Sequence, residues 1–178
     1  ALFREFSREK VSCFYSIGSR FSCSNNSNAR LLERIDIPSQ WKAVVAIPDF
    51  ELHTEKARAV LPASYVRSDV VHNIGAVSFL MAAFMYNKPE YLKFGLDDHV
   101  HVPYRLGLIP GSEEVIRSSV KSGAYGATIS GSGPTIIAFS PSDKAHLVGE
   151  SMVSTFKHHG ITSSYIVLDF DQSGISAV

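Results

Sequence analysis

Two apolar runs separated by a short loop of small residues constrain the fold of this chain most strongly. The runs, 124–129 and 136–140, read as β-strands, and the loop between them is Ser-Gly-Ser-Gly-Pro-Thr. Glycine accepts the backbone angles of a tight turn, so the loop is explained as a turn between two strands. Small residues also let backbone N–H groups approach a bound phosphate or carboxylate. The candidate phosphate loop consists of Ser130, Gly131, Ser132, Gly133 and Pro134.

Length and charge place the chain among globular proteins with one main domain. It has 178 residues, 45% of them hydrophobic, and 17 basic residues balance 17 acidic ones. This balance disfavours binding to nucleic acid or to an anionic membrane. No apolar run reaches roughly 18 residues and no signal sequence is recognisable, so we expect a cytoplasmic protein without a membrane span. Two cysteines, Cys13 and Cys23, are too few for a disulfide framework.

The beginning of the chain differs from the rest. Residues 1–30 include a Ser- and Asn-rich stretch at 22–28 and show no sustained helix or strand period, so we expect little regular structure there. The segment is nevertheless too apolar for a solvated linker. We interpret residues 1–32 as an atypical N-terminal segment, disordered or a remnant of something larger, and residues 33–178 as the folded domain.

The remaining elements alternate between helical and strand patterns. Strands are expected at 41–50, 124–129, 136–140 and 163–170, and helices at 54–62, 69–87, after Pro89, at 112–121 with Ser112 as its cap, and at 141–158. A strand pair lying between helices favours an α+β fold, a ferredoxin-like four-stranded antiparallel sheet with helices on one face. The helix at 69–87 has an apolar stripe expected in the core: Val70, Ile74, Val77, Leu80, Met81 and Phe84.

Two pairs of polar residues are candidates for ligand contacts. Thr54 and Arg58 lie four residues apart and share a helix face, where a hydroxyl and a guanidinium can hold a carboxylate or phosphate. A helix cap beside a solvated arginine explains this pair equally simply. His72 and Asn73 lie in the first turn of the long helix, where either ligand binding or capping accounts for them.

The segment 97–106 contains two histidines and an arginine. His99 and His101 lie on the same side of the chain only if this segment is extended. A zinc site would also need a further ligand from elsewhere, so we predict no metal site. Arg105 has apolar neighbours on both sides, which would hold its guanidinium in place for an anion.

Six segments, in order, resemble the homoserine branch of the GHMP small-molecule kinases. They cover about four-fifths of the chain and match the C-terminal part of that family: 47–50 (IPDF), 54–62 (TEKARAVLP), 69–73 (DVVHN), 98–105 (DHVHVPYR), 108–111 (LIPG) and 123–135 (GAYGATISGSGPT). The resemblance implies the GHMP-kinase C-terminal domain fold. It also implies transfer of the γ-phosphoryl group of MgATP to L-homoserine, giving O-phospho-L-homoserine for threonine biosynthesis.

The resemblance also assigns roles to the candidate residues. Arg58 and Arg105 would hold the α-carboxylate of homoserine, and Thr54, His72 and Asn73 would orient the rest of the molecule. The loop 130–134, with Gly131, would lie against both the nucleotide phosphates and the substrate. The arginine pair favours a carboxylate-bearing acceptor over a neutral sugar.

The chain departs from the family in one respect. The family's glycine-rich phosphate loop, which opens a helix, does not occur in the 178 residues. In the family, the preceding N-terminal part provides most of the contacts to ATP and Mg²⁺. We therefore expect this chain to be inactive alone, and we identify no catalytic residue in it. Two alternatives stay open: a non-catalytic ligand-binding remnant, or a GHMP kinase for another carboxylate-bearing acceptor such as mevalonate. A homodimer is compatible with the family.

Overall fold

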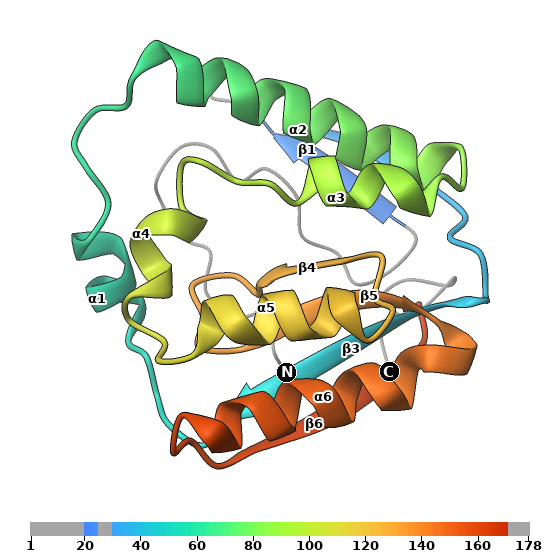
Figure 1. Ribbon diagram of the computed structural model, residues 1–178. Helices are drawn as coiled ribbons and strands as arrows, with labels where there is room; N and C mark the ends of the chain where they lie inside the picture. The colour runs from blue at the N-terminus through green and yellow to red at the C-terminus, as the bar shows by residue number, and fades with distance from the viewer. Residues whose placement is uncertain (1–19, 25–29, 171–178) are drawn as a thin grey trace, which may run out of the picture. The chain divides into compact units, whose positions relative to one another are not determined.

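The computed structural model describes residues 20–24 and 30–170 (Figure 1). The chain divides into two compact units, one of residues 1–37 with 170–178 and one of Pro38–Asp169. In the first unit, β1 (Arg20–Ser24) pairs with β2 (Arg30–Arg34) in antiparallel fashion. The expectation of little regular structure before residue 30 is therefore wrong for β1, and the rest of that segment lies outside the described residues. A domain boundary near residue 33 stays a prediction.

The second unit is built on a four-stranded sheet. Its strands are β3 (Trp41–Pro48), β4 (Gly126–Ile129), β5 (Ile136–Pro141) and β6 (Ser163–Leu168). Their order is β4-β5-β3-β6, and every neighbouring pair is antiparallel. The central strand is β3, where Val44 lies opposite Ala138 of β5 and Val167 of β6. This is the α+β, ferredoxin-like arrangement that the sequence predicts.

Six α-helices and two 3₁₀ turns are present in residues 30–170. They are α1 (Thr54–Ala59), α2 (Arg67–Met85), η1 (Pro89–Tyr91), α3 (Leu92–Gly95), α4 (Val102–Leu106), α5 (Ser112–Lys121), η2 (Ser142–Lys144) and α6 (Ala145–His158). Helices α5 and α6 lie side by side and cover one face of the sheet (Figure 1). The start of α5 differs from expectation, because its cap is Gly111 at φ +77° and the Ser112 hydroxyl instead donates to the Leu106 carbonyl at 3.1 Å.

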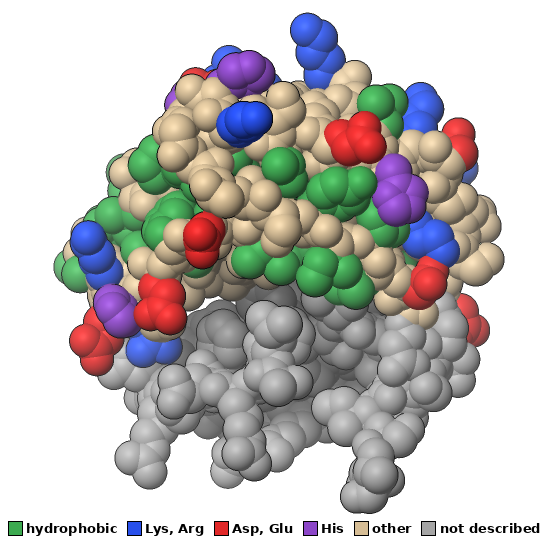
Figure 2. Space-filling view, turned by 90° about the horizontal axis from the view of Figure 1, so that it is seen from below, with side chains coloured by type: hydrophobic (Ala, Val, Ile, Leu, Met, Phe, Trp, Pro, Cys, Tyr) green, Lys and Arg blue, Asp and Glu red, His purple; other side chains and the backbone are tan. Residues whose placement is uncertain are grey.

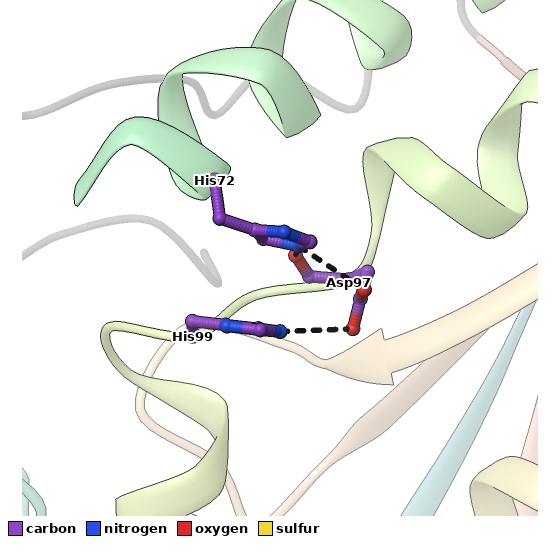
Figure 3. Close-up of side chains that lie close together, drawn as sticks. All are labelled: His72, Asp97 and His99. Atoms are coloured by element: carbon purple, nitrogen blue, oxygen red, sulfur yellow. Dashed lines mark hydrogen bonds and ion pairs between the residues drawn. The ribbon is translucent and has the colours of Figure 1, made fainter. Parts of the chain in front are cut away.

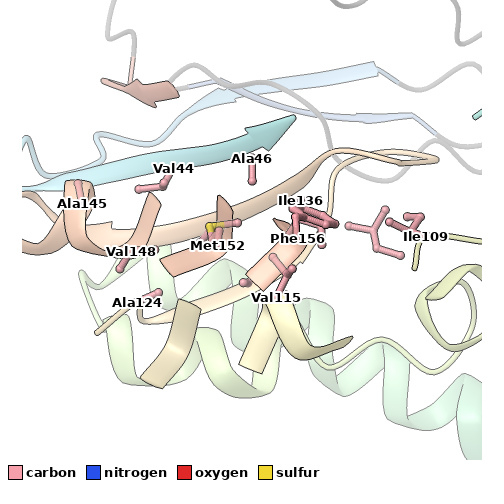
Figure 4. Packing of buried hydrophobic residues seen from close by; sticks show 13 residues of the cluster. Val44, Ala46, Ile109, Val115, Ala124, Ile136, Ala145, Val148, Met152 and Phe156 are labelled. Atoms are coloured by element: carbon pink, nitrogen blue, oxygen red, sulfur yellow. The ribbon is translucent and has the colours of Figure 1, made fainter. Parts of the chain in front are cut away.

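The main core lies between this face and the two helices. Val44 and Ala46 of β3 point toward Val115 of α5 and toward Met152 and Phe156 of α6 (Figure 4). All five side chains are fully buried. Alternate residues of β3 face this core because successive side chains of a strand point to opposite sides.

The opposite face of the sheet is covered in part by the end of α2. Phe84 of α2 packs against Trp41 of β3 and Phe139 of β5, with ring centroids 5.7 Å apart in both pairs. Trp41 also contacts Tyr125 at 5.4 Å. Helices therefore contact the sheet from this side too, in addition to the α5 and α6 layer.

The first half of α2 is not part of the core. Val70 is 42% exposed and Ile74 is 64% exposed, so the prediction that both are core residues is wrong. The buried residues of α2 are Ala76, Ala83 and Phe84. The apolar stripe does have a helical period, but only the second half of the helix reaches the sheet.

Helix α2 also bears on the membrane expectation. Among the described residues it is the one helix long and apolar enough to cross a bilayer. By this test of length and composition, the prediction of no such run is corrected. One such helix is weak evidence for a span, because the core helix of a water-soluble protein passes the same test.

On the face shown in Figure 2, described side chains of both charges are interspersed among hydrophobic ones.

Candidate functional site

Arg105 joins three segments that are distant in the sequence. Its Nη1 donates to the Gly131 carbonyl at 3.0 Å, and its Nε donates to the Ala57 carbonyl at 3.3 Å. The arginine lies on α4, Ala57 on α1, and Gly131 in the small-residue loop. Figure 1 shows α1 beside α4. Arg105 therefore links α1, α4 and the small-residue loop through hydrogen bonds to backbone carbonyls.

Asp98 holds the segment that leads into α4. Its Oδ1 accepts hydrogen bonds from the backbone N–H groups of Val100, His101 and Val102 at 2.7, 2.5 and 3.1 Å. Its Oδ2 lies 3.4 Å from Nδ1 of His101. A carboxylate at the start of a helix satisfies the backbone donors that have no partner within the helix. Asp98 thereby positions the helix that carries Arg105.

These hydrogen bonds change the acidity of Asp98. Burial alone would raise the pKa of this carboxyl, but the His101 ring and the three backbone donors outweigh burial and hold the pKa well below the usual 3.8. Nearby, burial is the main cause of a raised pKa of Tyr65; Tyr104 and Asp98 raise it further, and Arg105 lowers it. The ring of Tyr65 packs edge-on against Tyr104 at 6.1 Å. Tyr65 therefore belongs to the electrostatic surroundings of Arg105.

The low pKa of Asp98 predicts a pH dependence of stability. Because the folded-state pKa lies below the unfolded one, the stabilisation is complete above the unfolded value and is lost as the pH falls below about 4. Asp98→Ala should lower the free energy of unfolding at neutral pH by about 1.5–3 kcal/mol, the range for hydrogen bonds to a charged group. The variant should also lose less stability than the original chain on acidification.

Urea unfolding at about pH 7, 5 and 3 measures both effects. Glu113→Gln is the matched control, because Glu113 is 63% exposed and pairs with Arg117 on the helix surface. An Asp98→Ala variant with unchanged stability at neutral pH would contradict this account.

Thr54 and Arg58 lie one turn apart on α1, and both are exposed. The cap of α1 is His53, and no side chain caps the helix. Capping therefore does not account for Thr54. Because the Ala57 carbonyl binds Arg105, the backbone of Arg58 lies next to that contact. The predicted shared face of Thr54 and Arg58 is present.

The small-residue loop is a closed turn that is half-buried throughout. The N–H of Ser130 donates to the Thr135 carbonyl at 2.8 Å, and the N–H of Gly133 donates to the Ser130 carbonyl at 3.0 Å. Gly131 and Gly133 have φ of +60° and +84°, where L side chains are strained. A Cβ on Gly131 would meet no atom within 4 Å, whereas one on Gly133 would lie 2.7 Å from Ile109. The turn explanation is thus correct, and space beside Gly131 remains.

His72 and Asn73 contact a different segment from the one around the guanidinium of Arg105. The Asn73 side-chain oxygen accepts the N–H of His99 at 2.8 Å. The ring of His72 stacks on that of His99, with centroids 3.7 Å apart. Their substrate role stays a prediction.

A separate pocket of about 380 Å³ opens beside α1. None of the predicted site residues lines it. Its lining consists of Phe50, Glu51, Leu52, His53, Lys56, Leu108, Pro110 and Ile161.

Sequence reasoning did not single out Asp98, Tyr65 or the Ala57 carbonyl. Asp98 had a recognisable signal, since an aspartate a few residues before Val102-Pro103 is typical of a helix start. Tyr65 and the Ala57 carbonyl had none, because their roles depend on contacts with Tyr104 and Arg105 of α4, which lie far from them in the sequence.

Comparison with known proteins agrees with this fold. The family model described as GHMP kinases C terminal matches residues 90–158, which run from η1 to the end of α6. The crystal structure of homoserine kinase from Cytophaga hutchinsonii superimposes with a TM-score of 0.76 at 32% identity. This match covers 80% of the chain and 46% of that structure. The chain contains a GHMP kinase C-terminal region.

Homoserine kinases are also found among the sequence relatives of this GHMP kinase region. The homoserine kinase of Desulfitobacterium hafniense is 40% identical over 139 residues, covering 78% of the chain and 47% of that protein. The homoserine kinase of a Synechococcus strain is 38% identical, covering 88% of the chain and 51% of that protein. The L. major mevalonate kinase, at 14% identity and a TM-score of 0.57, shares the fold. The chain spans about half the length of the relatives it matches.

Proposed function

We propose that this chain is the substrate-binding part of a homoserine kinase. The observation that carries the proposal is Arg105, which links α1 and its exposed Thr54 and Arg58 to the loop at Gly131. A carboxylate held by guanidinium groups next to a phosphate-binding loop suits phosphorylation of a hydroxy amino acid. In the reaction, the homoserine hydroxyl oxygen forms a bond to the γ-phosphorus of ATP. The bond from that phosphorus to the β,γ-bridging oxygen breaks, ADP leaves with that oxygen, and the hydroxyl proton is released to solvent.

The residues of this chain fit part of an ATP site. The open space beside Gly131, together with the small side chains of Ser130 and Ser132, suits the approach of a phosphate. When bound, ATP supplies the phosphoryl group, and Mg²⁺ neutralises its charge. The remaining nucleotide contacts would come from a part resembling the family's N-terminal half. The chain's own contribution is to orient homoserine by its carboxylate.

Rejoining the chain with such a part tests the proposal. We expect residues 35–178, placed behind the N-terminal half of the Desulfitobacterium relative, to release ADP from ATP only when L-homoserine is present. Phosphorus NMR would detect O-phospho-L-homoserine as the product. The 178-residue chain by itself should give no ADP release under the same conditions.

The controls separate the alternatives. Mevalonate, also a carboxylate, should not replace homoserine in the rejoined protein. Phosphorylation of mevalonate without phosphorylation of homoserine would assign the chain to another acceptor. A correctly folded rejoined protein that binds neither acceptor would favour a non-catalytic remnant.

A further inference from the structure

Two histidines and an aspartate from separate segments meet beside the first turns of α2. His72 lies on α2, and Asp97 and His99 follow α3. Nε2 of His72 is 3.1 Å from the Asp97 carboxylate, and Nε2 of His99 is 3.8 Å from its other oxygen. One possible ligand atom from each of the three residues lies within 4.8 Å of the other two. Figure 3 shows both rings reaching the same carboxylate.

The surroundings orient His99 toward this group. Asp69, one helical turn before His72, has its carboxylate 3.5 Å from Nδ1 of His99. A carboxylate on one ring nitrogen holds the proton there and leaves the other nitrogen free as a metal ligand, as is usual for metal-bound histidines. The Asn73 side chain also holds the backbone of His99. His99 is therefore held by a carboxylate and an amide on α2.

We propose that His72, Asp97 and His99 form a binding site for zinc or a similar first-row divalent ion. Two imidazole nitrogens and a carboxylate suit zinc, whereas magnesium and calcium prefer oxygen ligands alone. Zinc–ligand bonds of about 2.0–2.1 Å place tetrahedral ligands roughly 3.3 Å apart. The backbone carbonyl of Asp97, also 3.1 Å from Nε2 of His72, offers a fourth ligand atom at the site.

Binding needs a small rearrangement that the site permits. The two rings are nearly parallel, at an interplanar angle of 14°, and must tilt so that both nitrogens point at one ion. The side chains of His72, His99 and Asp97 are 38, 40 and 56% exposed, so rotation meets little packing resistance. The ion would tie α2 to the segment that continues into Asp98 and α4. Its effect is to order the segment that carries Arg105, independently of the reaction proposed above.

Metal titration of the full 178-residue chain tests the site. The metal-stripped chain, with Cys13 and Cys23 blocked by iodoacetamide, is titrated with Zn²⁺ by calorimetry and with Co²⁺ by visible absorption. We expect one saturable equivalent of zinc, visible cobalt bands, and a melting temperature that rises with added zinc. His72→Ala with His99→Ala should weaken zinc binding by at least about tenfold, and Asp69→Asn by about 10–100-fold, the range for outer-shell partners.

The chain offers a matched control. His158→Ala with His159→Ala removes two histidines at the far end of α6 and should leave zinc affinity unchanged. Asp97→Asn preserves side-chain shape and should weaken binding, which guards against a folding defect in the double-alanine variant. Equal affinity in the original chain and the His72/His99 variant, loss of binding in the His158/His159 variant, or no saturable binding would each overturn the proposal. In those cases the cluster is only a stacked imidazole pair beside Asp97.

Discussion

Arg105→Ala is expected to raise the homoserine requirement of the rejoined enzyme far more than its ATP requirement. The guanidinium is proposed to pair with the substrate carboxylate, and removing one member of a buried charge pair costs about 2–5 kcal/mol, roughly 30-fold or more in affinity. Steady-state kinetics with each substrate varied in turn measures the effect. An unchanged homoserine dependence would remove Arg105 from the substrate site.

The structural contacts of Arg105 require a second measurement. The arginine also binds the carbonyls of Ala57 and Gly131, so its loss could weaken binding by releasing α1 from the loop. Arg58→Ala should raise the homoserine requirement without changing the free energy of unfolding, because Arg58 is exposed. Arg117→Ala is the neutral control, since its side chain is 71% exposed on α5. Only a loss specific to homoserine in both site variants supports a direct carboxylate contact.

Phe156→Ala should destabilise the fold more than any of the site substitutions. Phe156 is fully buried on α6 within the main core beside Val115 and Met152. Removing a buried aromatic ring loses its transfer free energy and leaves a cavity, together about 3–5 kcal/mol. Chemical denaturation should show a lower midpoint and a smaller free energy of unfolding.

A substitution on the same helix provides the comparison. Leu147 lies on α6 but is 56% exposed, so Leu147→Ala should change the free energy of unfolding by less than about 0.5 kcal/mol. Equal losses in the two variants would mean that α6 does not pack on the sheet as described.

The fold was predictable because its signals are local. The strands at 124–129 and 136–140 and the turn at Gly131 follow from side-chain pattern and glycine conformation, which neighbouring residues determine. The structure confirms the strand pairing and the ferredoxin-like order. The prediction for Val70 and Ile74 is wrong because helical period shows which face is apolar, not which half of the helix reaches the sheet.

The candidate site was predictable only in its parts. Arg58, Arg105 and the loop were identified by residue type and family resemblance, yet the carbonyl partners of Arg105 were not. The histidine and aspartate cluster was missed for the same reason. The ring of His101 contacts Asp98 and does not join His99. The second histidine of the cluster is His72, which lies 27 positions before His99 in the chain.

By itself, the sequence determined the order of strands and helices from β3 to β6 apart from the short helix α4, the glycine turn and the likeness to the homoserine kinases. These depend on short-range pattern and on the identity of individual residues. Only the tertiary structure decided that Arg105 bridges α1 and the loop, that His72 meets His99, and that half of α2 is exposed. Such contacts join residues far apart in the chain, and they are determined by how helices and loops pack against the sheet.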